Sequence, residues 1–198
     1  MNWTIVSYYT NNYKSVAEEY LIPSVKRFEL DYYIVEVPSL GDWKQNTGYK
    51  PTFIKQILQK INSNLVFIDV DAIINSYPEL FDNIPQEFDI GIYSYSGELE
   101  GKHSTDKSKW GVLSGTLYIR NNLKIYNLID KWISCIPNIR WEQTALDLAI
   151  GASYDIKVYN LPREYCYITS KPNGDLPNDP IEKPVISHFQ KSRELRNK

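Results

Sequence analysis

Short apolar runs alternate with amphipathic stretches along this chain, a pattern typical of an α/β protein. Runs of strand length predict strands at residues 3–9, 32–37, 65–68, 89–95 and 112–119. Apolar residues at helical spacing predict helices at residues 13–21, 53–61, 123–136 and 141–150, and a short turn or helix at 77–81. Two further short strands are expected at residues 157–161 and 185–189. We therefore predict a single α/β domain over residues 1–198, with a mostly parallel central sheet flanked by helices.

Two segments lack this periodicity and are expected to be irregular. Residues 96–109 are rich in Gly, Ser, Lys and Glu, which predicts a surface loop and a candidate lid over a ligand. Residues 171–184 contain four prolines and are expected to wrap between the last two strands. Pro23 is expected to kink or end the first helix, because proline lacks the N–H that helices use.

The composition is that of an ordinary soluble globular protein. Of the 198 residues, 42% are hydrophobic and 23% are charged, which suits one substantial core. The net charge of −2 provides no basic field for nucleic acid or membranes, although the basic tail at 191–198 leaves nucleic acid open as a partner. No apolar run is long enough to span a bilayer, and the first residues lack a signal-peptide pattern. Cys135 and Cys166 have no framework spacing and are expected to be reduced thiols of a cytoplasmic protein.

Two carboxylates separated by one residue follow the apolar strand at 65–68. Asp69 and Asp71 share a face if the segment is extended, and ligands of open α/β sheets bind beyond the carboxyl ends of the strands. Neighbouring carboxylates repel each other, and a hard divalent cation relieves the repulsion. The alternative is that both acids cap the next turn.

Seven motifs in order along the chain resemble those of the nucleotide-diphospho-sugar glycosyltransferases with the GT-A fold and an Asp-x-Asp motif, the glycogenin- and galactosyltransferase-like superfamily. The motifs are Lys50-Pro51-x-Phe53-Ile54, Val66–Ala72, Pro78–Phe81, Ser114–Ile119, Trp141–Leu146, Leu161–Cys166 and His188–Arg193. Two positions depart from the family pattern: Leu113 stands where many members have Asn, and Glu142 replaces the commoner Asp. The resemblance implies a Rossmann-like GT-A domain and transfer of a hexose from a nucleoside diphosphate sugar.

The resemblance also implies a metal site and a donor site. Asp69, Asp71 and His188 would hold the metal, with Asp71 as the direct carboxylate ligand and Asp69 on the metal, the ribose or a metal-bound water. Carboxylate, imidazole and phosphate ligands together suit Mn²⁺, with Mg²⁺ as the alternative. The donor, expected to be a UDP-hexose, would contact Tyr8, Tyr9, Thr10, Lys50, Asp69, Ser114, Gly115, Lys191 and Arg193. The alternatives are strand packing for the tyrosines, a strand bulge for Gly115 and a solvated position for Lys50, Lys191 and Arg193.

Glu142 and Gln143 are the candidate catalytic residues at the start of the last long helix. In an inverting enzyme Glu142 would be the general base, and in a retaining enzyme Gln143 or Glu142 would support a front-face or ion-pair process. The alternative is a carboxylate that stabilises the helix N-terminus. The sequence is compatible with either stereochemistry of transfer and specifies neither the sugar nor the acceptor.

Two other functions fit parts of the pattern. A non-catalytic nucleotide-sugar-binding module would keep the metal and donor residues without turnover. A phosphohydrolase of the haloacid dehalogenase type would use Asp69 as a nucleophile, but that class places its acidic motif near the start of the domain. Detection of a phosphorylated Asp69 would favour that class.

Overall fold

The fold is described from a computed structural model that covers residues 2–94, 111–169 and 180–195. The predicted lid at 96–109 and most of the proline-rich segment at 171–184 lie outside these residues. In the described part of the chain, no helix has both the length and the apolar character needed to cross a membrane.

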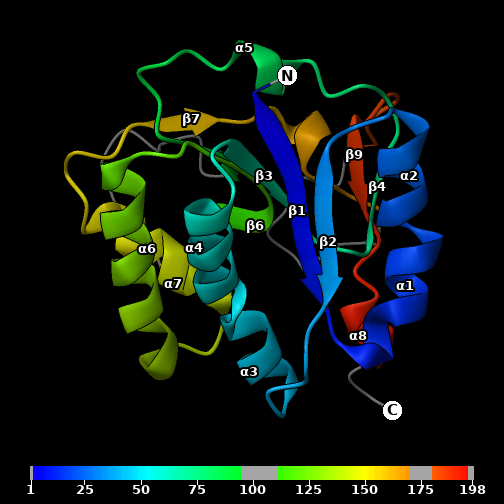
Figure 1. The fold of residues 1–198 in the computed structure, drawn as a ribbon, viewed down its shortest axis with the longest axis horizontal. Coiled ribbons are helices and arrows are strands. Elements are labelled where there is room, and N and C mark those ends of the chain that lie inside the picture. The colour runs from blue at the N-terminus through cyan, green and yellow to red at the C-terminus, as the bar shows by residue number, and fades with distance from the viewer. Residues whose placement is uncertain (1, 95–110, 170–179, 196–198) are drawn as a thin grey trace.

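A six-stranded sheet forms the centre of the molecule (Figure 1). Its strands in spatial order are β2 (Tyr32–Glu36), β1 (Trp3–Tyr9), β3 (Asn64–Ile68), β6 (Val112–Ile119), β5 (Ile90–Ser94) and β7 (Val158–Asn160). β1 runs parallel to β2 and β3, and β5 runs parallel to β7, whereas β6 is antiparallel to both of its neighbours. The predicted mostly parallel sheet is therefore confirmed.

Helices cover both faces of this sheet. On one face lie α4 (Lys50–Lys60), α6 (Leu123–Cys135) and α7 (Glu142–Gly151), and on the other lie α1 (Lys14–Glu19) and α2 (Leu21–Arg27) (Figure 1). The strand residues alternate between the two cores: Leu65 and Phe67 of β3 pack with α4 and α6, and Val66 and Ile68 pack on the opposite side. Because β3 is buried on both faces, its side chains are apolar on both faces, which explains the unbroken apolar run in the sequence.

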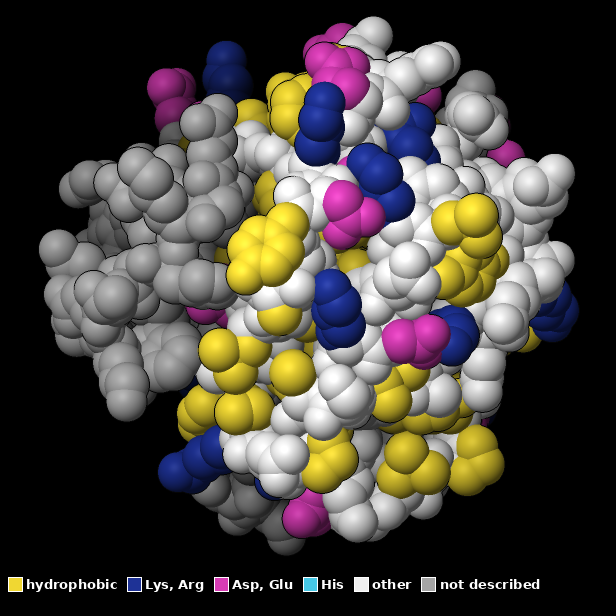
Figure 2. Space-filling model, turned by 90° about the vertical axis from the view of Figure 1, so that its left-hand side faces the viewer, with side chains coloured by type: hydrophobic (Ala, Val, Ile, Leu, Met, Phe, Trp, Pro, Cys, Tyr) yellow, Lys and Arg dark blue, Asp and Glu magenta, His cyan; other side chains and the backbone are white. Residues whose placement is uncertain are grey.

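The surface over α4 and α6 shows hydrophobic side chains in separate groups, with charged side chains between them (Figure 2).

The first helical region is divided at Tyr20, between α1 and α2, so the predicted interruption near Pro23 is confirmed. Pro23 lies in the first turn of α2, where a missing N–H costs no helical hydrogen bond.

A second, three-stranded sheet packs beside α2. It consists of β4 (Ala72–Ile74), β9 (Ile186–His188) and β8 (Tyr167–Ile168), with β4 antiparallel and β8 parallel to β9. Only the strand β9 was predicted. β4 and β8 are three and two residues long, which is too short to produce a visible periodicity.

Helix α3 (Trp43–Gly48) was not predicted, although the sequence carries its start signal. Asp42 Oδ1 accepts a hydrogen bond from the Gln45 N–H, and Gln45 Oε1 accepts one from the Asp42 N–H, both at 2.8 Å. This capping box is an Asp-x-x-Gln pattern that can be read without a structure. The remaining short elements are α5 (Leu80–Asn83), α8 (Ser192–Leu195) and three 3₁₀ turns at Asn11–Tyr13, Ile136–Asn138 and Arg163–Tyr165.

Candidate metal centre and donor pocket

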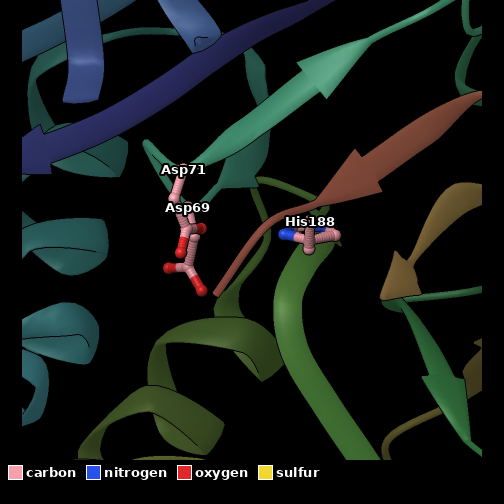
Figure 3. A group of neighbouring side chains, drawn as sticks. All are labelled: Asp69, Asp71 and His188. Atoms are coloured by element: carbon pink, nitrogen blue, oxygen red, sulfur yellow. The ribbon is translucent and has the colours of Figure 1, made fainter. Parts of the chain in front are cut away.

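Asp69, Asp71 and His188 meet beyond the carboxyl end of β3 (Figure 3). Each residue offers one ligand atom, and these three atoms lie within 4.8 Å of one another. The Asp69 N–H donates to the Gly115 carbonyl at 2.9 Å, and the Asp69 carbonyl accepts from the Ala72 N–H at 3.1 Å, so the chain turns sharply between the two acids. The pairing of Ala72 with His188 in the β4–β9 ladder then brings the imidazole to the same place.

Gly115 makes the close approach of His188 possible. A Cβ atom at this position would lie 2.9 Å from His188 Cε1, 3.1 Å from His188 Nδ1 and 3.4 Å from Asp69 Oδ2. Side chains do not tolerate a contact under 3.0 Å, so any larger residue would displace the imidazole or the backbone. The glycine, predicted as a donor contact, thus also provides the space for the histidine ring.

The His188 ring is buried and held at one nitrogen. Its Nε2 lies 2.8 Å from Thr116 Oγ1. Burial lowers the pKa of His188 to about 4, so the imidazole is neutral near pH 7. A neutral imidazole fixed by a hydrogen bond at one nitrogen can coordinate a metal through the other.

Asp71 is oriented by the backbone of the C-terminal segment. Its Oδ2 accepts a hydrogen bond from the Lys191 N–H at 2.8 Å, and its carbonyl accepts one from the Phe189 N–H at 3.0 Å. Burial and, after it, the nearby Asp69 raise the pKa of Asp71 to about 7. Two carboxylates and a neutral imidazole are a donor set that suits Mn²⁺ or Mg²⁺, and a cation would offset the repulsion between the acids.

Lys50 lies buried beside this centre and is not a solvated residue at a helix start. Its Nζ is 3.1 Å from Asp69 Oδ1 and 3.2 Å from Glu142 Oε1. It also donates to the carbonyl and the hydroxyl of Ser114 at 3.1 and 3.3 Å. Burial opposes the charge, but the two carboxylates outweigh it and raise the pKa of Lys50, so the ammonium stays charged.

Glu142 is the most enclosed carboxylate of the pocket. Its Oε2 accepts a hydrogen bond from Ser114 Oγ at 2.9 Å, while Oε1 has the ion pair with Lys50 but no well-formed hydrogen bond among the described residues. Burial raises the pKa of Glu142, and Lys50 counters part of that rise. The Trp132 Nε1–H donates to the Glu142 carbonyl at 3.0 Å and so fixes the start of α7.

A cavity of about 770 Å³ connects these groups. It brings together twelve of the thirteen predicted site residues, namely Tyr8, Tyr9, Thr10, Lys50, Asp69, Asp71, Ser114, Gly115, Glu142, Gln143, His188 and Arg193. Lys191 differs, because its ammonium pairs with Glu194 at 2.9 Å and lies over the Tyr20 ring. Lys191 contributes its backbone N–H to the site, and donor contact by its side chain stays a prediction.

The Tyr8 ring is a packing element as well as a wall of the cavity. It contacts the rings of Tyr49, Phe53 and Phe67, and its hydroxyl donates to the Asn46 carbonyl at 2.7 Å. Stacking of this ring on a base stays a prediction.

Several residues of the site and its cavity were not predicted. Thr116 of β6 holds His188 from outside the cavity lining, and the irregular pairing of β6 with β5 between Leu113 and Leu117 hides this contact from strand alternation. Cys166 lines the cavity, but burial raises its pKa to about 12, so its thiol is protonated and a poor nucleophile. Trp43 and Trp141 also line the cavity, and α3, which carries Trp43, had not been predicted.

The fold is that of known glycosyltransferases. A glycosyltransferase involved in the glycosylation of the major capsid of PBCV-1 superposes with a TM-score of 0.66 at 13% identity, covering 100% of this chain and 98% of that chain. The WbbM bifunctional glycosyltransferase gives 0.61 at 15% identity, over 94% of this chain and 45% of that chain. Mouse xyloside xylosyltransferase 1 gives 0.53 at 11% identity, over 97% and 99% of the two chains.

These structural matches confirm the predicted GT-A glycosyltransferase fold. No protein-family model matches the sequence, and a search of curated proteins finds no relative. The likeness therefore lies in the three-dimensional arrangement of the chain.

Proposed function

We propose that this protein is a metal-dependent glycosyltransferase that moves a hexose from a nucleoside diphosphate sugar, with UDP as the expected nucleotide. The observation that carries the proposal is the convergence of Asp69, Asp71 and His188 at one end of the cavity. The fold shared with glycosyltransferases supports the same class. A cytoplasmic location belongs to the proposal and is supported by the free thiols of Cys135 and Cys166.

Asp71, Asp69 and His188 would hold Mn²⁺ or Mg²⁺, and the bound cation would stabilise the diphosphate that leaves as the anomeric bond breaks. The chain's own residues prepare the site for this reaction. Lys50 and Ser114 are buried polar residues with fixed positions beside Asp69, because they are hydrogen-bonded to each other and Lys50 forms an ion pair with Asp69. Fixed dipoles and charges in a buried site need no reorganisation during the reaction.

Glu142 and Gln143 are proposed to act on the sugar and on the acceptor hydroxyl. Burial raises the pKa of the Glu142 carboxyl group, and its Oε1 has no well-formed hydrogen bond to any described residue, so this carboxylate would receive the acceptor's proton in an inverting reaction. In a retaining reaction, Gln143 or Glu142 would instead support the departing and arriving groups on one face of the sugar. The anomeric configuration of the product distinguishes these roles.

The competing functions predict different outcomes. A binding module would bind donor and metal without turnover. The haloacid dehalogenase alternative is not supported, because the fold matches glycosyltransferases and Asp69 follows the third strand along the chain.

The test combines a donor screen with one isosteric variant. UDP-hexoses and other nucleoside diphosphate sugars are screened with Mn²⁺ by thermal shift, because a bound ligand stabilises the native state, and donor hydrolysis is then measured. Asp71→Asn should abolish metal-dependent donor binding and hydrolysis while the protein stays folded. Asp130→Asn is the matched control, since Asp130 lies on α6 and pairs with Lys55 outside the cavity. Full activity of Asp71→Asn would refute the proposal, and tight binding without turnover in the unaltered protein would favour the binding module.

A further inference from the structure

Two tryptophans from distant parts of the chain meet at the wall of the cavity. Trp43 begins α3 and Trp141 directly precedes α7, and their ring centroids are 5.3 Å apart at an interplanar angle of 73°. Both line the cavity. The Arg140 guanidinium lies 5.0 Å from the Trp141 ring centroid, which adds a cation–π contact to the pair.

Trp141 is the most exposed of the tryptophans that the structure describes. Its relative exposure is 40%, whereas Trp3 and Trp132 are only 2% and 1% exposed. Leaving a large apolar ring in water forgoes the stabilisation that its burial would give. An exposed aromatic ring that lines a cavity is typical of a surface that a ligand covers.

The surroundings of the two rings combine apolar and hydrogen-bonding groups. Gln143 and Thr144 follow Trp141 at the start of α7, and Asn46 lies one turn after Trp43 in α3, all on the cavity lining. A pyranose ring has the matching character, because its axial C–H groups form an apolar face and its hydroxyls form a polar edge. Its C–H groups, which carry partial positive charge, favour the negative face of an indole.

We propose that Trp43 and Trp141 form the acceptor subsite and that the acceptor is a carbohydrate whose pyranose ring packs on these indoles. This inference rests on the proposed glycosyltransferase function. Trp141 immediately precedes Glu142, so a sugar on this surface has its hydroxyl edge beside the carboxylate and Gln143.

Charge argues against a nucleic acid as the occupant, although bases also stack on tryptophan. Single-stranded nucleic acid requires a positively charged groove that follows its backbone. Among the residues that the structure describes, the charged ones on the cavity lining are three carboxylates, Asp69, Asp71 and Glu142, and two cations, Lys50 and Arg193. Lys50 is already paired with two of these carboxylates. A neutral sugar meets no such electrostatic barrier.

The test uses the whole chain with isotope-labelled indole N–H groups, in the presence of UDP and Mg²⁺, because Mg²⁺ is diamagnetic and does not broaden the signals of nearby indoles. Methyl pyranosides and disaccharides such as lactose, maltose and cellobiose are titrated, and the five tryptophan signals are followed by NMR. We expect at least one of these sugars to shift the signals of Trp43 and Trp141 and to leave those of the buried Trp3 and Trp132 in place. The same sugar should accept a labelled hexose from the donor.

The KM values of tryptophan variants for acceptor and donor then test the role of the acceptor subsite. Trp141→Ala and Trp43→Ala should each raise the acceptor KM by about tenfold or more, the scale for truncating a tryptophan at a binding surface, and should change the donor KM less. Trp141→Phe should recover most of the acceptor affinity because it keeps an aromatic face. Tyr154→Ala is the control, since Tyr154 is a fully exposed aromatic residue outside the cavity lining and its loss should change neither KM.

Three results would overturn the inference. These are the absence of any shift at either indole with the whole sugar panel, unchanged acceptor KM in both alanine variants, and a peptide or oligonucleotide that shifts the two indoles and accepts the hexose. Each of these results counts against the inference only when the protein is shown to bind UDP and Mn²⁺. Failure of the unaltered protein to bind UDP and Mn²⁺ would instead contradict the proposed function.

Discussion

Gly115 is the position where one added methyl group should most directly disturb the candidate metal centre. In Gly115→Ala the new Cβ would lie 2.9 Å from His188 Cε1 and 3.1 Å from Nδ1. Favourable carbon contacts lie near 3.5–4.0 Å, so the imidazole would have to move by roughly 0.5–1 Å. It cannot simply withdraw, because His188 pairs with Ala72 in the β4–β9 ladder and its Nε2 is held by Thr116.

Two separate losses follow from this displacement. Overpacking a buried site costs about 1–3 kcal/mol of unfolding free energy, and each kcal/mol lowers the Tm of a protein of this size by about 2–4 °C. A ligand that is held in the wrong orientation typically weakens metal binding by about 10–100-fold. We expect Gly115→Ala to show both effects, measured by thermal unfolding and by calorimetric titration with Mn²⁺.

Gly91→Ala is the matched control for the loss of stability. A Cβ at Gly91 would lie 3.0 Å from Tyr118 Cβ and 3.2 Å from Leu161 Cδ2, so it should overpack the sheet to a comparable extent. It contacts none of the three metal-centre residues and should leave the Mn²⁺ affinity unchanged. Equal Mn²⁺ affinity in Gly115→Ala and Gly91→Ala would refute the proposed ligand role of His188.

Two further predictions concern the charges of the site. Because the pKa of Asp71 is raised to about 7 in the folded protein, the folded state holds a proton there that the unfolded state releases near pH 4. Asp71 should therefore destabilise the metal-free protein progressively as pH rises from about 4 to 7, and Asp71→Asn should remove this component of unfolding curves measured across that range. Over the same range Mn²⁺ should bind more tightly as pH rises, and a pH-independent affinity would contradict this assignment. Lys50→Met should lower the unfolding free energy in urea by about 3–5 kcal/mol, because Glu142 would be left buried without its cation. Lys55→Met, at a surface pair, should cost only about 0–1 kcal/mol, and equal costs for the two variants would show that the buried pair has no special role.

Local sequence signals accounted for most of the central sheet and the long helices. The predicted strand at 112–119 coincides with β6, and the helix predicted at 123–136 differs from α6 only at its last residue. These elements have long apolar patterns that are visible in the chain itself. The capping box of α3 was equally local and could have been used, whereas the pairing of β4 with β9 joins residues that are more than a hundred positions apart.

The sequence by itself determined the α/β class, the strand that ends at the acidic pair and the order of the motifs, because periodicity, caps and turns act over a few neighbouring residues. Only the tertiary structure decided that Lys50 pairs with Asp69 and Glu142, that Gly115 leaves room for His188, and that Trp43 meets Trp141. Each of these contacts depends on strand order and on the packing of helices against the sheet. No local pattern specifies such distances between residues far apart in the chain.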